Sequence, residues 1–200
     1  GAAPTSAWSN RWTNSLPLGE VDCGNLTVTR FAARDPLPPL AWRIATRVAF
    51  TVMQPRLKRA RERAKSIGPR AWQDIVWPAW AEHYVLAGLG PHAPGLLHAF
   101  REALRDIDAA LIAYPPLGLA ARACQSAERM ARPVALVPLF HQEDPLNSLP
   151  AWVRHYREAA AILALTEAEA QTFRDHFHHA NVHVVGAAVD VDDLLAPTIS

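Results

Sequence analysis

Residues 134–167 read VALVPLFHQEDPLNSLPAWVRHYREAAAILALTE and carry the strongest fold signal in the chain. The run Val134–Phe140 is apolar throughout, which is typical of a strand that is buried on both faces. A helical stretch at 149–160 follows, and a second buried strand is expected at Ile162–Leu165. In open α/β sheets, ligands bind beyond the carboxyl ends of the strands. We therefore expect a site at the polar run that ends the first strand: His141, Gln142, Glu143 and Asp144.

The same alternation of strands and helices extends on both sides of this stretch. Short apolar strands are predicted at Ala109–Tyr114 and Val182–Val185, with helices of 10–14 residues between successive strands. This rhythm is typical of parallel β-α-β units. The predicted fold class is α/β, a Rossmann-like parallel sheet with helices on both faces and an added helical insertion.

The N-terminal segment 1–34 is predicted to be extended, with turns at Leu16–Gly19 and Asp22–Asn25 and an edge strand at Asn25–Phe31. The predicted organisation places the helical insertion or lid at 35–90, the β-α-β core at 91–189 and the start of an interdomain linker at 190–200.

The insertion at 35–90 is predicted to hold three helices. The first has an apolar face of residues four apart and is interrupted at Pro55; that face comprises Leu40, Ile44, Val48 and Val52. The second is basic, and the third, at Arg70–Ala87, is expected to kink or break at Pro78.

The basic helix favours two interpretations, a solvated face or a surface that docks on an anionic membrane. Its apolar face, Leu57, Ala60, Ala64 and Ile67, is weak for membrane insertion. The membrane-surface candidates are Arg56, Lys58, Arg59, Arg61, Arg63 and Lys65.

Three features near the strand ends leave alternatives open. His141 is suited either to face a ligand or to be held by a loop hydrogen bond. Glu143 and Asp144 are suited to acid–base chemistry or sugar binding, and equally to a solvated turn before Pro145. Thr166 and Glu169 form a capping-box pattern at the start of a helix, which favours a structural role over ligand binding.

The composition excludes several classes of function. The 200 residues carry a formal net charge of +1, which argues against nucleic acid as a partner. Cys23 and Cys124 form no CxxC pair, which is typical of reduced thiols in a cytoplasmic protein. No metal site is expected, because the histidines at 176, 178, 179 and 183 straddle a predicted helix end.

The order of the motifs resembles the N-terminal domain of retaining GT-B glycosyltransferases of family 4, also called group 1. The resemblance rests on motifs spread over nearly the whole chain: Trp8, Trp12-Thr13-Asn14, Arg30-Phe31, Gly90-Pro91, Asp108 to Tyr114, Pro133 to Glu143, Ala164 to Glu169 and Val185 to Asp190.

This resemblance implies a transferase that moves a sugar from a nucleotide-sugar donor to an acceptor hydroxyl, with this domain on the acceptor side. His141 matches a histidine close to the donor sugar. Acceptor or donor contacts are implied for Tyr114, Pro115, Gln142, Glu143, Asp144, Thr166 and Glu169. The acceptor is a sugar or a lipid-linked molecule, and no cofactor is bound by this domain. The alternative is a non-catalytic binding or membrane-docking domain, peripheral at the inner membrane face.

The chain also departs from the family pattern. Neither the family's first strand with its glycine-rich loop nor its donor-binding C-terminal domain is found among these 200 residues. The expectation is therefore that the isolated chain is inactive and needs that domain as a partner. A missing strand would expose a sheet edge, which favours pairing with another chain, such as a homodimer.

Overall fold

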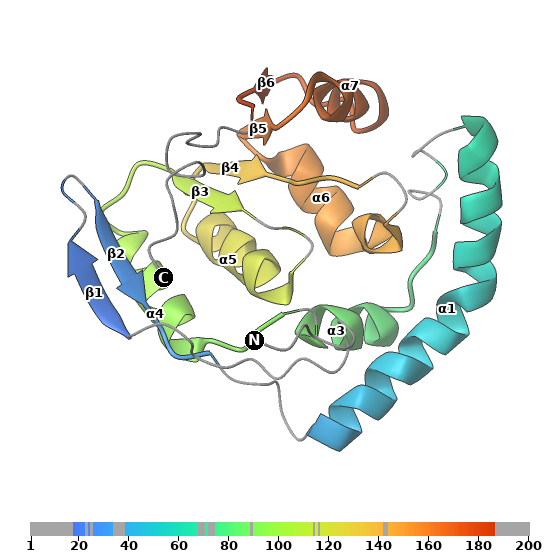
Figure 1. Ribbon diagram of the computed structural model, residues 1–200, viewed down its shortest axis with the longest axis horizontal. Helices are drawn as coiled ribbons and strands as arrows, with labels where there is room; N and C mark the ends of the chain where they lie inside the picture. The colour runs from blue at the N-terminus through green and yellow to red at the C-terminus, as the bar shows by residue number, and fades with distance from the viewer. Residues whose placement is uncertain are drawn as a thin grey trace, which may run out of the picture.

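A computed structural model describes residues 18–22, 24, 26–33, 39–67, 71, 75–88, 90–113, 115, 117–141 and 144–186. Its centre is a parallel sheet of four strands, which lie in the order β3-β4-β5-β6 (Figure 1). The strands are β3 (Ala110–Ala113), β4 (Val134–Val137), β5 (Ala161–Ala164) and β6 (Val182–Val184). The predicted α/β class with a parallel sheet is thus confirmed, and the arrangement is compatible with a Rossmann-like fold.

Each pair of neighbouring strands is joined by a helix, as the alternation predicted. The connecting helices are α5 (Gly118–Arg129), α6 (Pro150–Glu158) and α7 (Glu167–His176). Strand β4 is shorter than the predicted Val134–Phe140, because Pro138 has no N–H for the ladder and Leu139 has a φ of 48°. His141 therefore follows the strand after a three-residue bend.

The two faces of the sheet are covered unequally in the described part of the chain. Ala110, Ile112, Leu136 and Ile162 are buried on one face, whereas Leu111, which points to the other, is 64% exposed. Where successive crossovers are right-handed and advance in one direction, as β3-β4-β5-β6 do in order, their helices fall on the same face. The expectation that helices cover both faces is therefore not met at β3.

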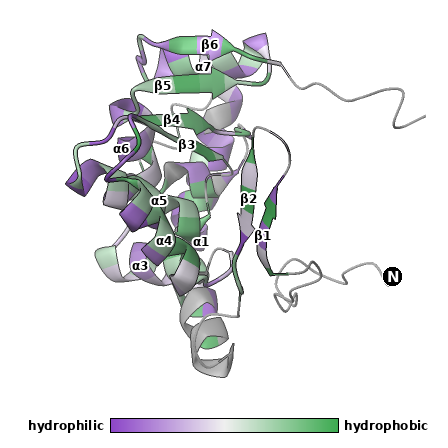
Figure 2. Cartoon of the chain, turned by 90° about the vertical axis from the view of Figure 1, so that its left-hand side faces the viewer, coloured by the Kyte–Doolittle hydropathy of each residue, from purple (hydrophilic) through white to green (hydrophobic). Residues whose placement is uncertain are grey.

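The first two strands form a separate antiparallel hairpin, β1 (Gly19–Asp22) with β2 (Thr27–Arg30). Figures 1 and 2 both show this hairpin apart from the four-stranded sheet. The strand predicted at Asn25–Phe31 exists as β2, and it pairs with β1 in this hairpin. Strand β1 was missed, because its sequence GEVD has little β-propensity.

Helix α1 (Pro39–Ile67) runs without a break through Pro55, so the predicted interruption was wrong. Proline removes one helical hydrogen bond. The flanking turns are held in place because Met53 and Leu57 are both buried in the core. The predicted apolar face does not enter the core, because Ile44, Val48 and Val52 are exposed.

The helical insertion shares one hydrophobic core with the sheet. Its second described helix, α3 (Ala79–Gly88), begins directly after Pro78, so the predicted break there is confirmed. The chain then continues through α4 (Pro94–Ala103) to β3. Met53, Trp77 and Val85 belong to the same buried cluster as Leu136 and Ile162. The insertion is therefore packed as part of the core. Among the described residues, no helix has the length and apolar character to span a membrane.

Candidate functional site

His141 lies beyond the carboxyl end of β4, with its side chain exposed. The preceding residue, Phe140, is inserted among aromatic rings, at centroid distances of 6.0 Å from Tyr156, 5.3 Å from Phe173 and 5.7 Å from Phe177. This aromatic cluster anchors the loop from one side. The imidazole is consequently presented to solvent by a backbone that is fixed immediately before it.

The backbone of His141 is also held from the other side. Its carbonyl oxygen accepts hydrogen bonds from Asp144 N, at 3.0 Å, and from Asn147 Nδ2, at 2.9 Å. The buried hydroxyl of Tyr156 donates in turn to Asn147 Oδ1 at 2.8 Å. A chain of hydrogen bonds therefore connects the candidate residue to α6, and buried polar networks of this kind restrict the geometry of a loop.

Glu169 connects the ends of two strands. Its Oε1 accepts from Phe140 N at 2.6 Å, and its Oε2 accepts from Leu165 N at 2.7 Å. Thr166 Oγ1 accepts from Glu169 N at 3.1 Å, which confirms the predicted N-cap. In a capping box, the Glu169 carboxylate would accept a hydrogen bond from Thr166 N. Here it accepts from Leu165 N and Phe140 N instead. Glu169 is 8% exposed and acts as a clamp on the His141 loop.

Asp144 has a structural role in the same loop. Its carboxylate accepts from Leu146 N at 2.9 Å and caps the short 3-10 helix η1 (Pro145–Ser148). Burial raises the pKa of the Asp144 carboxyl, while the bond from Leu146 and the charge of the nearby His141 act to lower it. Asp144 therefore stabilises the turn that follows His141.

The remaining predicted contacts are dispersed. Thr166 is exposed at the start of α7, and Pro115 is buried in the turn that follows β3. Tyr114, Gln142 and Glu143 lie outside the described residues. The structure thus groups His141, Asp144 and Glu169 at the ends of β4 and β5.

The histidines near the end of α7 make local hydrogen bonds. His179 Nε2 lies 2.8 Å from Ala159 O, and its Nδ1 accepts from Asn181 N at 3.2 Å. His183 Nε2 lies 2.7 Å from Asn181 Oδ1. No group of three metal-binding side chains occurs in the described ranges. His179 instead connects the end of α6 to the turn before β6.

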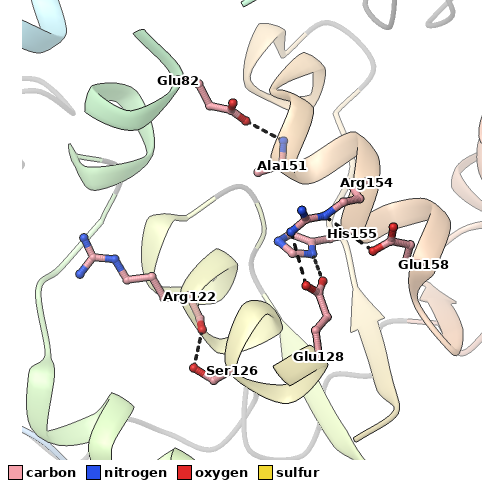
Figure 3. Close-up of polar contacts among 8 residues, drawn as sticks. All are labelled: Glu82, Arg122, Ser126, Glu128, Ala151, Arg154, His155 and Glu158. Carbon is pink, nitrogen blue, oxygen red and sulfur yellow. Dashed lines mark hydrogen bonds and ion pairs between the residues drawn. The ribbon is translucent and has the colours of Figure 1, made fainter. Parts of the chain in front are cut away.

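A contact between a buried histidine and an exposed glutamate, which the sequence did not indicate, joins α5 to α6 (Figure 3). His155 Nδ1 lies 2.6 Å from Glu128 Oε1, as an ion pair would place it, and the His155 side chain is only 2% exposed. Burial lowers the pKa of the His155 imidazole, and the Glu128 carboxylate opposes this shift. Arg154 and Glu158 border the pair, with Arg154 3.6 Å from Glu158. The partners are 27 residues apart on different helices, so no sequence spacing connects them.

A hydrogen bond joins the helical insertion to the core. Glu82 on α3 accepts from Ala151 N, in the first turn of α6, at 2.6 Å (Figure 3). A carboxylate is favourable at a helix N-terminus, where backbone N–H groups lack helical partners. Glu82 therefore fixes the insertion against the helix that also holds the His141 loop.

A shallow depression lies where the insertion meets the core near the end of β3. It is lined by Leu86 and Ala87 of α3, Pro91, His92, and the first turns of α5 at Gly118, Leu119 and Arg122. The Arg122 side chain extends away from the Glu128–His155 pair in Figure 3. The depression thus adjoins the loop after β3, which contains Pro115.

Comparison with known proteins adds no relative to this picture. No family model matches the chain, and no curated protein or solved structure matches it. Its function therefore has to follow from the chemistry of its own residues.

Proposed function

We propose that this chain forms the acceptor side of a glycosyltransferase site, in which a hexose-like group moves from a nucleotide-sugar to an acceptor hydroxyl. The bond between the anomeric carbon and the donor diphosphate breaks, and a bond to the acceptor oxygen forms. The acceptor proton passes to the departing phosphate oxygen. A second domain that binds the nucleotide completes the cleft.

The observation that carries this proposal is the presentation of His141. Its imidazole is exposed beyond the carboxyl end of β4, while its backbone is fixed by Asp144 N and Asn147 Nδ2. Glu169 fixes the preceding residue through Phe140 N. A rigid backbone with a free imidazole favours recognition of a ligand, because little side-chain entropy has to be lost elsewhere in the loop. In this proposal His141 hydrogen-bonds the donor sugar.

The depression between α3 and α5 has a volume of about 10 Å³, room for about one water molecule, and in this proposal it marks only where the acceptor side of the site would lie. It adjoins the loop after β3 and is bordered by the polar side chains of His92 and Arg122. Ligands of open α/β sheets gather beyond the strand ends, where this loop and the His141 loop both lie. We infer that the acceptor binds along the β3 loop, and that it is a sugar or a lipid-linked molecule.

The test is sugar transfer by the full-length protein with His141→Ala. Wild-type and variant proteins are incubated with UDP-, GDP- and dTDP-hexoses and a panel of acceptors, and release of the nucleoside diphosphate is measured. Loss of one hydrogen bond of roughly 1–3 kcal/mol predicts a decrease in kcat/KM of about 5- to 150-fold.

The matched control is His98→Ala on α4, because His98 is exposed and far from β4 in the sequence. This variant should turn over at the wild-type rate. Wild-type turnover by His141→Ala would remove His141 from the mechanism. Absence of nucleoside diphosphate release from every donor tested with the wild type would overturn the transferase proposal.

A further inference from the structure

Helix α1 carries a continuous line of exposed side chains that changes from apolar to cationic along its length. Ile44, Val48 and Val52 are 55%, 47% and 42% exposed. The same line continues at helical spacing through three exposed arginines. We call this line the outer stripe: Ile44, Val48, Val52, Arg56, Arg59 and Arg63.

The outer stripe is held outward by the packing of the opposite part of α1. The residues that α1 buries against the core are Ala49, Met53, Leu57 and Ala60. Each of them directly follows a residue of the outer stripe in the sequence. Adjacent helical residues are separated by about 100° around the axis. The apolar half of the stripe therefore cannot turn inward without removing the buried line from the core. Figure 1 shows α1 along the outer edge of the molecule.

The second half of α1 is strongly cationic. Six basic residues lie between 56 and 65, and all six are exposed. The acidic residue among them, Glu62, accepts from Lys65 Nζ at 2.7 Å, and this bond lowers the pKa of Glu62. The partner of this surface must therefore offer negative charge next to an apolar region.

A second copy of the chain does not meet this requirement. Two α1 helices side by side in antiparallel order would place Val48 and Val52 against arginines, and parallel order would place arginine against arginine. Peptide helices dock into concave grooves. The surface of α1 is convex, and the depression described above is lined by residues 86–122 instead.

We propose that the outer stripe docks this protein on an anionic phospholipid surface. Arg56, Arg59 and Arg63 contact the headgroups, and Ile44, Val48 and Val52 enter the boundary with the acyl chains. Interfacial helices combine these two contributions. The structure changes which apolar residues are involved, since Leu57 and Ala60 face the core and the stripe faces outward.

The test is co-sedimentation of the protein with vesicles of phosphatidylcholine alone or of an equimolar mixture with phosphatidylglycerol. We expect binding only to the anionic vesicles, with a weaker affinity at high salt. Arg59→Gln combined with Arg63→Gln should lower the partition coefficient roughly 30-fold, from the contribution of each basic residue near such a surface. Val48→Thr combined with Val52→Thr should lower it roughly tenfold, because half-exposed valines contribute part of their full transfer energy.

The matched control removes the same charge elsewhere, with Arg105→Gln and Arg129→Gln after α4 and at the end of α5. Circular dichroism melting of each variant checks that it is folded. The proposal is overturned if wild-type protein does not bind anionic vesicles at low salt, which would leave an acidic protein helix as the partner. It is also overturned if the control weakens binding as much as the α1 variants do, or if the threonine variant binds normally. His141→Ala should bind vesicles at wild-type affinity, so this proposal and the transferase proposal can fail separately.

Discussion

Replacing Glu169 by glutamine tests whether this side chain holds the candidate site together. The Glu169 carboxylate accepts hydrogen bonds from Phe140 N at 2.6 Å and from Leu165 N at 2.7 Å. The residue is 8% exposed. Glutamine has the same shape, but its NH₂ group would face one of these two N–H donors. A hydrogen bond to a charged group contributes about 1.5–3 kcal/mol, and a buried donor without a partner adds a comparable cost.

From these terms we expect Glu169→Gln to lower the free energy of unfolding by about 3 kcal/mol. For a domain of this size, that corresponds to a decrease in Tm of roughly 6–12 °C. The assay is urea unfolding followed by circular dichroism, in which the midpoint should fall while the slope stays constant. Amide hydrogen exchange should accelerate at Phe140 and Leu165 in particular.

The matched control is Glu167→Gln, two residues away on the same helix. Glu167 is 70% exposed and pairs with Arg174 at 2.6 Å. A surface ion pair of this kind contributes little, so the unfolding free energy should change by less than about 1 kcal/mol. If Glu169→Gln proves as mild as this control, Glu169 does not clamp the His141 loop.

Two further predictions concern buried groups that titrate. Folding lowers the pKa of His155 below its unfolded value of about 6.5, so below that pH the unfolded chain binds more protons than the folded one. The free energy of unfolding should therefore be highest above this pH. It should fall on acidification by up to about 1.4 kcal/mol per pH unit. Urea midpoints measured between pH 5 and about 8 should show this slope in the wild type and a flatter one in His155→Gln, and equal slopes would contradict the assignment. Burial raises the pKa of the Cys124 thiol to about 12. In a Cys23→Ser background, Cys124 should therefore react with a thiol reagent only after denaturant is added. Rapid labelling of the folded protein would refute its burial.

The sequence predicted the sheet because its signal is local. The strands β3, β4 and β5 are short apolar runs between amphipathic helices, and such runs have few alternatives to a buried parallel strand. The N-cap at Thr166 and the break at Pro78 were also predictable, because each depends on residues within one helical turn.

Several of the errors concern choices made by tertiary contacts. Two faces of α1 are apolar, and spacing alone favoured Val48 and Val52 over the line of Ala49 and Met53 that the core selects. Glu169 showed a capping pattern, but the N–H of Phe140, from a loop 29 residues earlier, takes one of its oxygens. The His155–Glu128 pair arises only because α5 packs against α6.

The order of the strands in the sheet has a consequence for biosynthesis. Strands β3, β4, β5 and β6 follow one another in space as they do in the sequence. A chain that leaves the ribosome from its N-terminus therefore delivers each new strand to an edge that already exists. No strand has to enter between two that have paired, so assembly can proceed one β-α unit at a time during translation.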